Sequence, residues 1–157
     1  MNNNREIRLI KAQLLTLLPQ WNSRITRPFK LLLDEGISLE MYYCLQTLFW
    51  LGGSATMSEL GKYMYLPKQQ MTKLVNRLAD QNLIERQSDP SDRRIIRIVL
   101  TEMASHYIDD FLDVNAGCFE DMLDEMTAED RAAFLESITT ITNIFAKLPC
   151  PCKPPED

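Results

Sequence analysis

The sequence contains little histidine and little glycine. His106 is the only histidine, and five glycines are spread over 157 residues. A lone histidine near the start of a predicted helix is typical of a surface or capping residue. The sequence shows no Ser-His-Asp set, no pair of catalytic carboxylates with a cleft signature and no Gly-rich phosphate loop. These absences argue against an enzyme, so we predict no catalytic residue and no cofactor.

Metal and membrane signatures are also missing. The four cysteines, Cys44, Cys118, Cys150 and Cys152, match no zinc spacing, which favours free thiols and no metal site. The acidic run EDMLDEM lacks the residue order of a calcium loop. No apolar run reaches the roughly 18 residues of a membrane span, and the N-terminus lacks the layout of a signal peptide. The sequence therefore predicts a cytoplasmic protein without a membrane partner.

Basic residues are concentrated in the middle of an acidic chain. The net charge is -5, but residues 60–100 hold eight Lys or Arg against four acidic residues. Residues 101–157 hold three basic residues against thirteen acidic ones. A basic segment in an acidic protein indicates contact with a polyanion, although a solvated basic surface would give the same composition.

The first third of the chain predicts two helices. From Glu6 to about Leu33, apolar residues recur at helical spacing, and Pro19 and Pro28 should each kink or divide this helix. The segment DEGIS predicts its end, with Gly36 at the C′ position. The following run LEMYYCLQTLFWLGG is apolar nearly all round, which predicts a buried central helix ended by two glycines.

Two further helices follow with a tight break between them. Thr56 and Glu59 have the spacing of a capping box and predict a short helix to about Met64. Pro67 is expected at the first position of a longer helix, for which Asn82 is a left-handed C-cap. The predicted inward face of this helix is Met71, Leu74, Val75 and Leu78. Its predicted outward face is Lys68, Gln69, Gln70, Thr72, Lys73, Asn76 and Arg77.

A β-hairpin is predicted next, from LIERQS and RIIRIVL joined by the turn residues DPSDR. Alternation should place Ile96, Ile98 and Leu100 on the core, with Arg93 and Arg94 at the projecting tip. Thr101 is expected to cap a long helix to about Met126. A second capping box, Thr127 with Asp130, predicts a last helix to about Leu148.

These elements predict a mainly α protein with a small β-hairpin wing, that is, a winged helix-turn-helix. In such a unit the second helix enters the major groove of DNA. Gln69 and Gln70 are suited to adenine, Lys68 and Lys73 to guanine or phosphate, Thr72 to a base edge or phosphate, and Arg77 to the backbone. Arg93 and Arg94 suit a minor groove, and Asp92 suits an ion pair that stiffens the hairpin. The alternative is an ordinary exposed hairpin with charges for solubility.

The sequence resembles the multiple-antibiotic-resistance-regulator (MarR) family of bacterial transcription factors. The wing DRRIIRIVLT fits the family pattern through Asp92, Arg94, Ile98, Leu100 and Thr101, and SELGKYMYLPKQQMTKLVNRLADQNLIERQ matches the helix-turn-helix segment. The likeness covers about residues 38–104, with Asn82 and Ala104 at positions where the family often has glycine.

The resemblance implies a homodimeric repressor or activator whose terminal helices interlock. It implies a minor-groove role for Arg94 and a bracing role for Asp92. Residues 1–37 and 102–148 would then form the dimerisation region, residues 38–101 the DNA-binding region and residues 149–157 a Pro-rich tail. Many members release DNA on binding a small phenolic or aromatic ligand, and others sense oxidation through a cysteine.

We therefore predict a sequence-specific regulator of double-stranded DNA, a homodimeric repressor on a pseudo-palindromic operator. Candidates for a small aromatic effector pocket are Trp21, Tyr42, Tyr43 and Cys44, although core packing of the aromatics and a buried, inert Cys44 explain the same residues. The alternative function is a protein-interaction module that modulates another regulator without binding DNA. Such a module has no need for paired arginines beside a Lys-Gln-Gln helix face.

Overall fold

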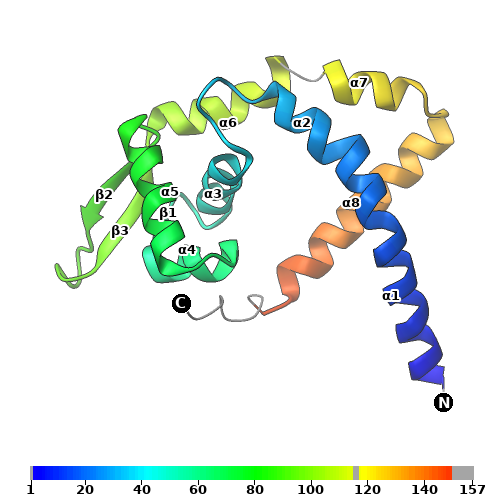
Figure 1. Cartoon of the computed structure of the whole chain (residues 1–157), viewed down its shortest axis with the longest axis horizontal. Coiled ribbons are helices and arrows are strands. Elements are labelled where there is room, and N and C mark those ends of the chain that lie inside the picture. The colour runs from blue at the N-terminus through cyan, green and yellow to red at the C-terminus, as the bar shows by residue number, and fades with distance from the viewer. Residues whose placement is uncertain (1, 115–116, 150–157) are drawn as a thin grey trace.

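The computed structural model describes residues 2–114 and 117–149. Figure 1 shows an arch. One limb holds the small sheet and the helices packed against it, the other holds the first and last helices, and further helices connect the limbs along the top. No helix in the described part of the chain is long and apolar enough to cross a membrane.

The N-terminal helix runs through its first proline. Helix α1 (Asn2–Trp21) contains Pro19 and continues as a π-helical segment (Asn22–Thr26) and then as α2 (Arg27–Leu32). In the π-helical segment, the Arg27 N–H donates to the Asn22 carbonyl, one residue beyond the α-helical partner. Pro28 follows directly and has no N–H to donate. Pro19 therefore does not divide the helix, and the irregularity lies just before Pro28.

The end of this helix differs from the prediction. Leu33, the C-cap, is already extended with φ -67° and ψ 139°, so Gly36 is not the C′ residue. Gly36 instead has φ +89° in a separate turn, in which the Ile37 N–H donates to the Asp34 carbonyl at 3.0 Å. The glycine is needed for the turn because a residue with a Cβ is strained at this φ.

Helix α3 (Leu39–Trp50) forms the centre of the first limb. Ser38 caps it by accepting the Met41 N–H at 3.2 Å. Met41, Cys44, Leu45 and Leu48 are fully buried. Tyr43, Phe49 and Trp50 are exposed, so only one face of this apolar helix is in the core. The helix ends as predicted, at two glycines with positive φ.

The helix-turn-helix consists of α4 (Met57–Met64) and α5 (Lys68–Asp80), preceded by strand β1 (Ser54–Thr56). The capping box is confirmed: the Thr56 hydroxyl accepts the Glu59 N–H at 3.2 Å, and the Glu59 carboxylate accepts the Thr56 N–H at 2.7 Å. This second bond is the main cause of the lowered pKa of Glu59. Pro67 is the N-cap of α5, whereas it was predicted to be the first helical residue, which is Lys68.

Helix α5 ends in a Schellman arrangement. Asn82 has φ +58°, and its N–H donates to the Ala79 carbonyl at 2.9 Å. The Leu83 N–H donates to the Leu78 carbonyl at 3.0 Å. These are the two bonds that satisfy the last carbonyls of a helix, and they confirm the left-handed C-cap at Asn82.

The hairpin is confirmed as β2 (Ile84–Ser88) and β3 (Ile96–Leu100), which pair antiparallel with Ser88 opposite Ile96. Strand β1 adds to the other edge of β3, giving the order β1-β3-β2. The sequence did not indicate β1, because three residues are too few for a periodic pattern. Ile98 is fully buried, but Ile96 is 42% exposed, because it lies beyond the part of β3 that β1 covers.

Three helices follow the sheet: α6 (Glu102–Val114), α7 (Gly117–Asp124) and α8 (Ala128–Lys147). The predicted single helix to about Met126 is therefore two helices. The Thr101 hydroxyl accepts the Ala104 N–H, which confirms the first cap. Thr127 also caps α8 by accepting the Asp130 N–H, but the Asp130 carboxylate accepts the Thr127 hydroxyl, so the reciprocal backbone bond of a capping box is missing. Residues 150–157 of the predicted tail lie outside the described residues.

The main core lies in the first limb, where α3, α5, β3 and the start of α6 meet. It holds the inward face of α5 as predicted. The buried residues include Met41, Leu45, Leu48, Leu60, Met71, Leu74, Val75, Leu78, Ile84 and Ile98. Since the opposite face of α5 takes no part in this packing, it is free to meet a ligand.

Candidate nucleic-acid interface

Helix α5 presents the predicted polar residues to solvent. Lys68, Gln69, Gln70, Thr72, Lys73 and Arg77 are all exposed. The Thr72 hydroxyl donates to the Lys68 carbonyl at 2.9 Å, so its proton is already used within the helix. Gln70, Lys73 and Arg77 line one shallow hollow of about 170 Å³ together with Glu40 of α3. The structure thus brings these side chains onto one surface.

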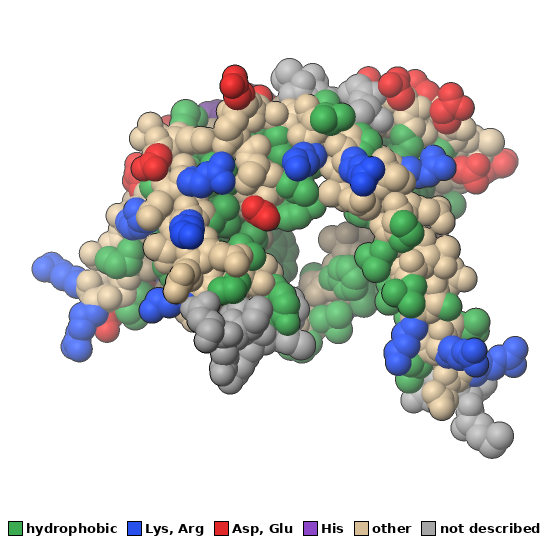
Figure 2. Space-filling view, viewed as in Figure 1, with side chains coloured by type: hydrophobic (Ala, Val, Ile, Leu, Met, Phe, Trp, Pro, Cys, Tyr) green, Lys and Arg blue, Asp and Glu red, His purple; other side chains and the backbone are tan. Residues whose placement is uncertain are grey.

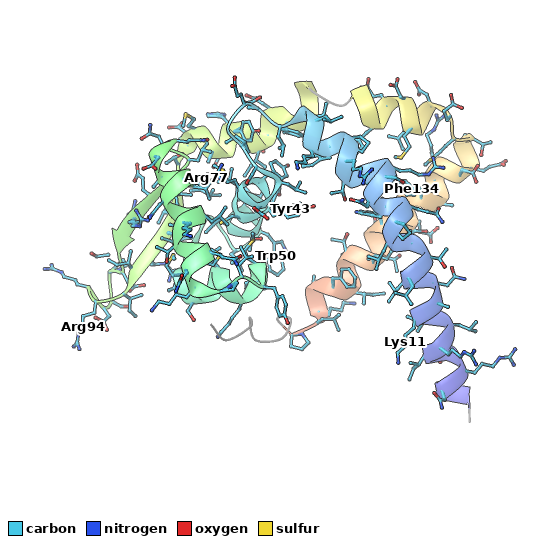
Figure 3. The ribbon with its side chains drawn as sticks, viewed as in Figure 1. Lys11, Tyr43, Trp50, Arg77, Arg94 and Phe134 are labelled. Atoms are coloured by element: carbon cyan, nitrogen blue, oxygen red, sulfur yellow. The ribbon has the colours of Figure 1, made fainter. Side chains whose placement is uncertain are left out.

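The wing carries its arginines away from the body. Figure 3 shows Arg94 at the end of the hairpin, pointing outward, and its side chain is 94% exposed. Asp92 lies beside it: its carboxylate accepts the Arg94 N–H at 3.0 Å and is 3.7 Å from Arg94 Nε. Arg93, also exposed, occupies the same loop. The predicted wing residues are therefore grouped at one projecting tip.

Charge is unevenly distributed over the molecule. Figure 2 shows Lys and Arg side chains along the limb that carries α5 and the hairpin and also on α1 and α2, whereas Asp and Glu side chains gather around α7. Exposed basic side chains can attract a polyanion over a distance of about 10 Å at 0.1 M salt.

Four residues at the base of the wing were not singled out from the sequence. Arg97 contacts Ser54 and Asp89, and Arg86 donates to the Asn76 side chain on α5. Strand alternation predicted only that Arg97 points away from the core, and Asp89 was predicted only to be a turn residue. Partners from three different elements could not be recognised without the fold.

The effector candidates lie in different surroundings. Tyr42 is buried, with its ring 4.8 Å from Phe29 and its hydroxyl 2.7 Å from Gln46 Nε2. Burial raises the pKa of Tyr42. Burial also raises the pKa of the Cys44 thiol to about 12, which leaves almost no reactive thiolate at neutral pH. Tyr43 is exposed on the other side of α3.

Two apolar grooves lie elsewhere. Trp21 lines a groove of about 410 Å³ with Met122, Met126 and Phe134, between α1, α7 and α8. A larger groove, of about 600 Å³, lies between the first limb and the end of α8 and is lined by Trp50, Tyr63, Phe145 and Leu148. The rings of Trp50 and Tyr63 meet edge to face at 5.6 Å. The sequence did not indicate this second groove.

No group of three or more His, Cys, Asp or Glu residues in the described part of the chain is arranged to hold a metal ion. His106 is exposed, 3.9 Å from Glu102 on the same helix.

The helix pair, the wing and the three-stranded sheet define a winged helix-turn-helix protein. A family model described as the MarR family matches residues 35–95. The chain is 32% identical over 109 residues to an uncharacterised HTH-type transcriptional regulator, YsmB of Bacillus subtilis, covering 69% of this chain and 74% of YsmB. It is 31% identical to the organic hydroperoxide resistance transcriptional regulator of the same organism, covering 65% and 69%. The chain belongs to the MarR family of transcriptional regulators, which are not enzymes.

Solved structures agree on the fold. The apo form of wild-type MarR from E. coli gives a TM-score of 0.66 at 19% identity, covering 80% of this chain and 94% of MarR. The organohalide-sensing regulator RdhR in its 2,4-dichlorophenol-bound form gives 0.55 at 21% identity, covering 96% and 87%. Both confirm the predicted mainly α winged-helix architecture.

Proposed function

We propose that this regulator is a homodimeric, cytoplasmic repressor that binds double-stranded DNA. Residues 38–101 would be the DNA-binding region, and residues 1–37 and 102–148 the dimerisation region. The observation that carries the proposal is the pairing of two free surfaces on one limb: the exposed polar face of α5 and the projecting arginines of the wing.

These two surfaces suit the two grooves of a duplex. A helix placed in the major groove reads bases through residues near its N-terminus, and α5 begins with Lys68, Gln69 and Gln70. Gln can bond adenine through two hydrogen bonds, and Lys can bond guanine or phosphate. Lys73, Thr72 and Arg77, further along, would meet bases or the backbone. Arg93 and Arg94 would then enter the neighbouring minor groove, where the negative potential is concentrated, with Asp92 holding Arg94.

Arg94→Ala is expected to weaken operator binding by roughly 1–3 kcal/mol, because it removes one buried cation from the complex at each half-site. A mobility-shift titration measures the effect, and gel filtration checks that the oligomeric state is unchanged. Since Arg94 is almost fully exposed in the free protein, stability should not change. Unchanged affinity would contradict the placement of the wing in DNA.

Gln70→Ala is expected to cost about 1–3 kcal/mol of discrimination between operators, because a bidentate contact to a base is lost. The measurement compares affinities for an operator and for single-base variants of it. Gln81→Ala is a matched control, because Gln81 lies at the far end of α5 and its amide is bonded to the Gly36 carbonyl. A loss that is equal for all sequences would instead indicate that Gln70 contacts the backbone.

A dimer is supported by the apolar surfaces of the second limb. Helix α8 has no buried residue, and α1 exposes many large apolar side chains. Patches of this kind on a soluble chain mark interaction sites. The exposed residues of the two helices include Ile7, Leu9, Ile10, Leu14, Leu15, Leu18, Leu135, Ile144 and Phe145.

A symmetric dimer should protect a pseudo-palindrome. We expect a footprint of two half-sites about 10 base pairs apart, or a multiple of that, because two recognition helices must meet the same face of the duplex. Protection of a single half-site by a protein that is monomeric in sedimentation would count against the dimer.

We further propose that a small aromatic effector releases the repressor from DNA. The groove lined by Trp50, Tyr63 and Phe145 supports this, because it lies between the helix-turn-helix limb and α8 and is mostly apolar. The groove beside Trp21 is the second candidate. In a protein of similar fold, BpsR of Bordetella bronchiseptica, DNA binding is regulated by 6-hydroxynicotinic acid. Titrating phenols and aromatic acids into the protein–DNA complex tests the proposal, with release of the labelled operator as the expected result.

A protein that binds no duplex at low salt would instead support an interaction module. The mobility-shift titration with DNA therefore separates the two functions that the sequence left open.

A further inference from the structure

One arginine joins three parts of the winged helix. Arg97 of β3 donates from Nε to the Ser54 hydroxyl at 2.8 Å and from Nη2 to the Ser54 carbonyl at 3.2 Å. Its Nη1 lies 3.4 Å from the Asp89 carboxylate. Ser54 begins β1, which leads directly into α4, and Asp89 is the first residue of the wing loop. The guanidinium thus connects the start of the helix-turn-helix with the wing.

Asp89 also closes the loop that carries the tip. Its Oδ1 accepts the Ser91 N–H at 2.8 Å, the Ser91 hydroxyl and the Asp92 N–H at 3.3 Å. On the backbone, the Asp89 N–H donates to the Ile95 carbonyl, and the Ile95 N–H donates to the Asp92 carbonyl, both at 2.9 Å. One carboxylate therefore holds the loop with one oxygen and the sheet with the other. The bonds from Ser91 are the main cause of its lowered pKa, so it is charged at neutral pH.

The ion pair lies in a partly covered position. The Asp89 side chain is 14% exposed and the Arg97 side chain 31% exposed, whereas Asp92 and Arg94 at the tip are 47% and 94% exposed. Water screens a shielded pair less than an exposed one. Of the two ion pairs in the wing, the inner one is thus better able to fix a geometry.

A second polar contact supports the same arrangement. Arg86 of β2 donates to the Asn76 side chain of α5, on the edge of the recognition face. Arg86 thus ties β2 to α5, and Arg97 ties β3 to β1, the strand that leads into α4. The Arg86 contact adds to the packing of β2 against α5.

We propose that Asp89 and Arg97 are positioning residues that set the direction of the wing, so that Arg94 reaches the minor groove while α5 occupies the major groove. This inference rests on the proposed DNA binding. A tip that is held in place before binding pays less ordering entropy in the complex. Arg97→Lys would keep the charge but would lose the planar guanidinium that serves three acceptors at once.

The proposal predicts a change in DNA affinity that is opposite to the change expected from charge alone. Asp89→Asn removes a negative charge close to the proposed DNA surface, so electrostatics alone would strengthen binding. If Asp89 positions the wing, the same change should weaken operator binding, by about tenfold. Asp80→Asn is a matched control, because it removes the same charge from a residue that is exposed at the end of α5. The control should leave affinity unchanged or slightly increase it.

A double-mutant cycle with Arg94→Ala identifies the mechanism. If Asp89 acts through Arg94, Asp89→Asn should cost about tenfold in the wild-type background and less than about twofold in the Arg94→Ala background. Arg97→Lys should behave in the same way, and it tests the pair by a variant that keeps its charge. Thermal unfolding of each variant establishes that the affinities refer to folded protein.

The outcomes are distinct. Costs that simply add in the cycle, or an Asp89→Asn protein that binds as tightly as the wild type, would overturn the positioning role and leave the proposed function intact. If the wild-type chain binds no DNA at any salt concentration, the proposed function itself fails. Coupled costs for both Asp89→Asn and Arg97→Lys, with Asp80→Asn neutral, are the expected result.

Discussion

Raising the salt concentration from 50 to 200 mM is expected to weaken operator binding by on the order of a thousandfold. DNA binding releases about 0.9 counterion for each phosphate that a protein neutralises, so log K falls linearly with log salt. In the proposed dimer, each protomer would bring Lys68, Lys73, Arg77, Arg93 and Arg94 to the candidate interface. If about six of the ten cations in a dimer meet phosphates, the expected slope is about -5. Fluorescence anisotropy with a labelled operator measures it directly.

The slope also counts contacts. Arg77→Ala should reduce it by about one for each protomer, because Arg77 lies where the helix would meet the backbone. Glu102→Gln on α6 is a suitable comparison, since it changes an exposed charge outside the proposed interface. Binding that hardly responds to salt would show that these cations do not face phosphates, and it would favour a protein partner instead.

Leu78→Ala is expected to lower the free energy of unfolding by about 3 kcal/mol, within the range of 2–5 kcal/mol measured for buried leucines. Leu78 is fully buried on the inward face of α5, in the cluster that includes Leu45, Leu48 and Ile98. Alanine favours helix at least as well as leucine, so the loss would come from the cavity. Since domains are stable by only about 5–15 kcal/mol, the variant should become partly unfolded under mild denaturant.

Urea unfolding followed by circular dichroism measures this change, at one protein concentration because a dimer's stability depends on it. Gln69→Ala on the opposite face of α5 is the matched control, and it should shift stability by less than about 0.5 kcal/mol. An equal loss for both variants would mean that the helix, rather than the core beneath it, responds to substitution. A negligible loss for Leu78→Ala would contradict its burial.

Local signals in the sequence were reliable where neighbouring residues determine the structure. The capping box of Thr56 and Glu59 and the C-cap at Asn82 formed as predicted, because their bonds join residues at most five apart. The inward face of α5 followed from the spacing of its apolar residues. The Gly36 prediction failed because the helix ended earlier and the glycine served a different turn.

Much of the candidate site was also predictable. The outward face of α5 and the arginine tip were named from periodicity and turn chemistry, and the structure places them on one limb (Figure 3). Strand β1 and the contacts of Arg97 were not predictable, since Ser54 and Arg97 are 43 residues apart. The four effector candidates lie apart. Trp21 is on α1, and α3 turns Cys44 inward and Tyr43 outward.

The sequence by itself determined the order of most elements, the polar face of α5 and the membership of a regulator family, because caps, periodicity and motifs are properties of short segments. Only the tertiary structure decided how the wing is held. The Arg97 guanidinium meets Ser54 and Asp89 after the chain has brought β1, β3 and the loop together. Bonds between distant segments depend on the folded arrangement, and no local pattern specifies them.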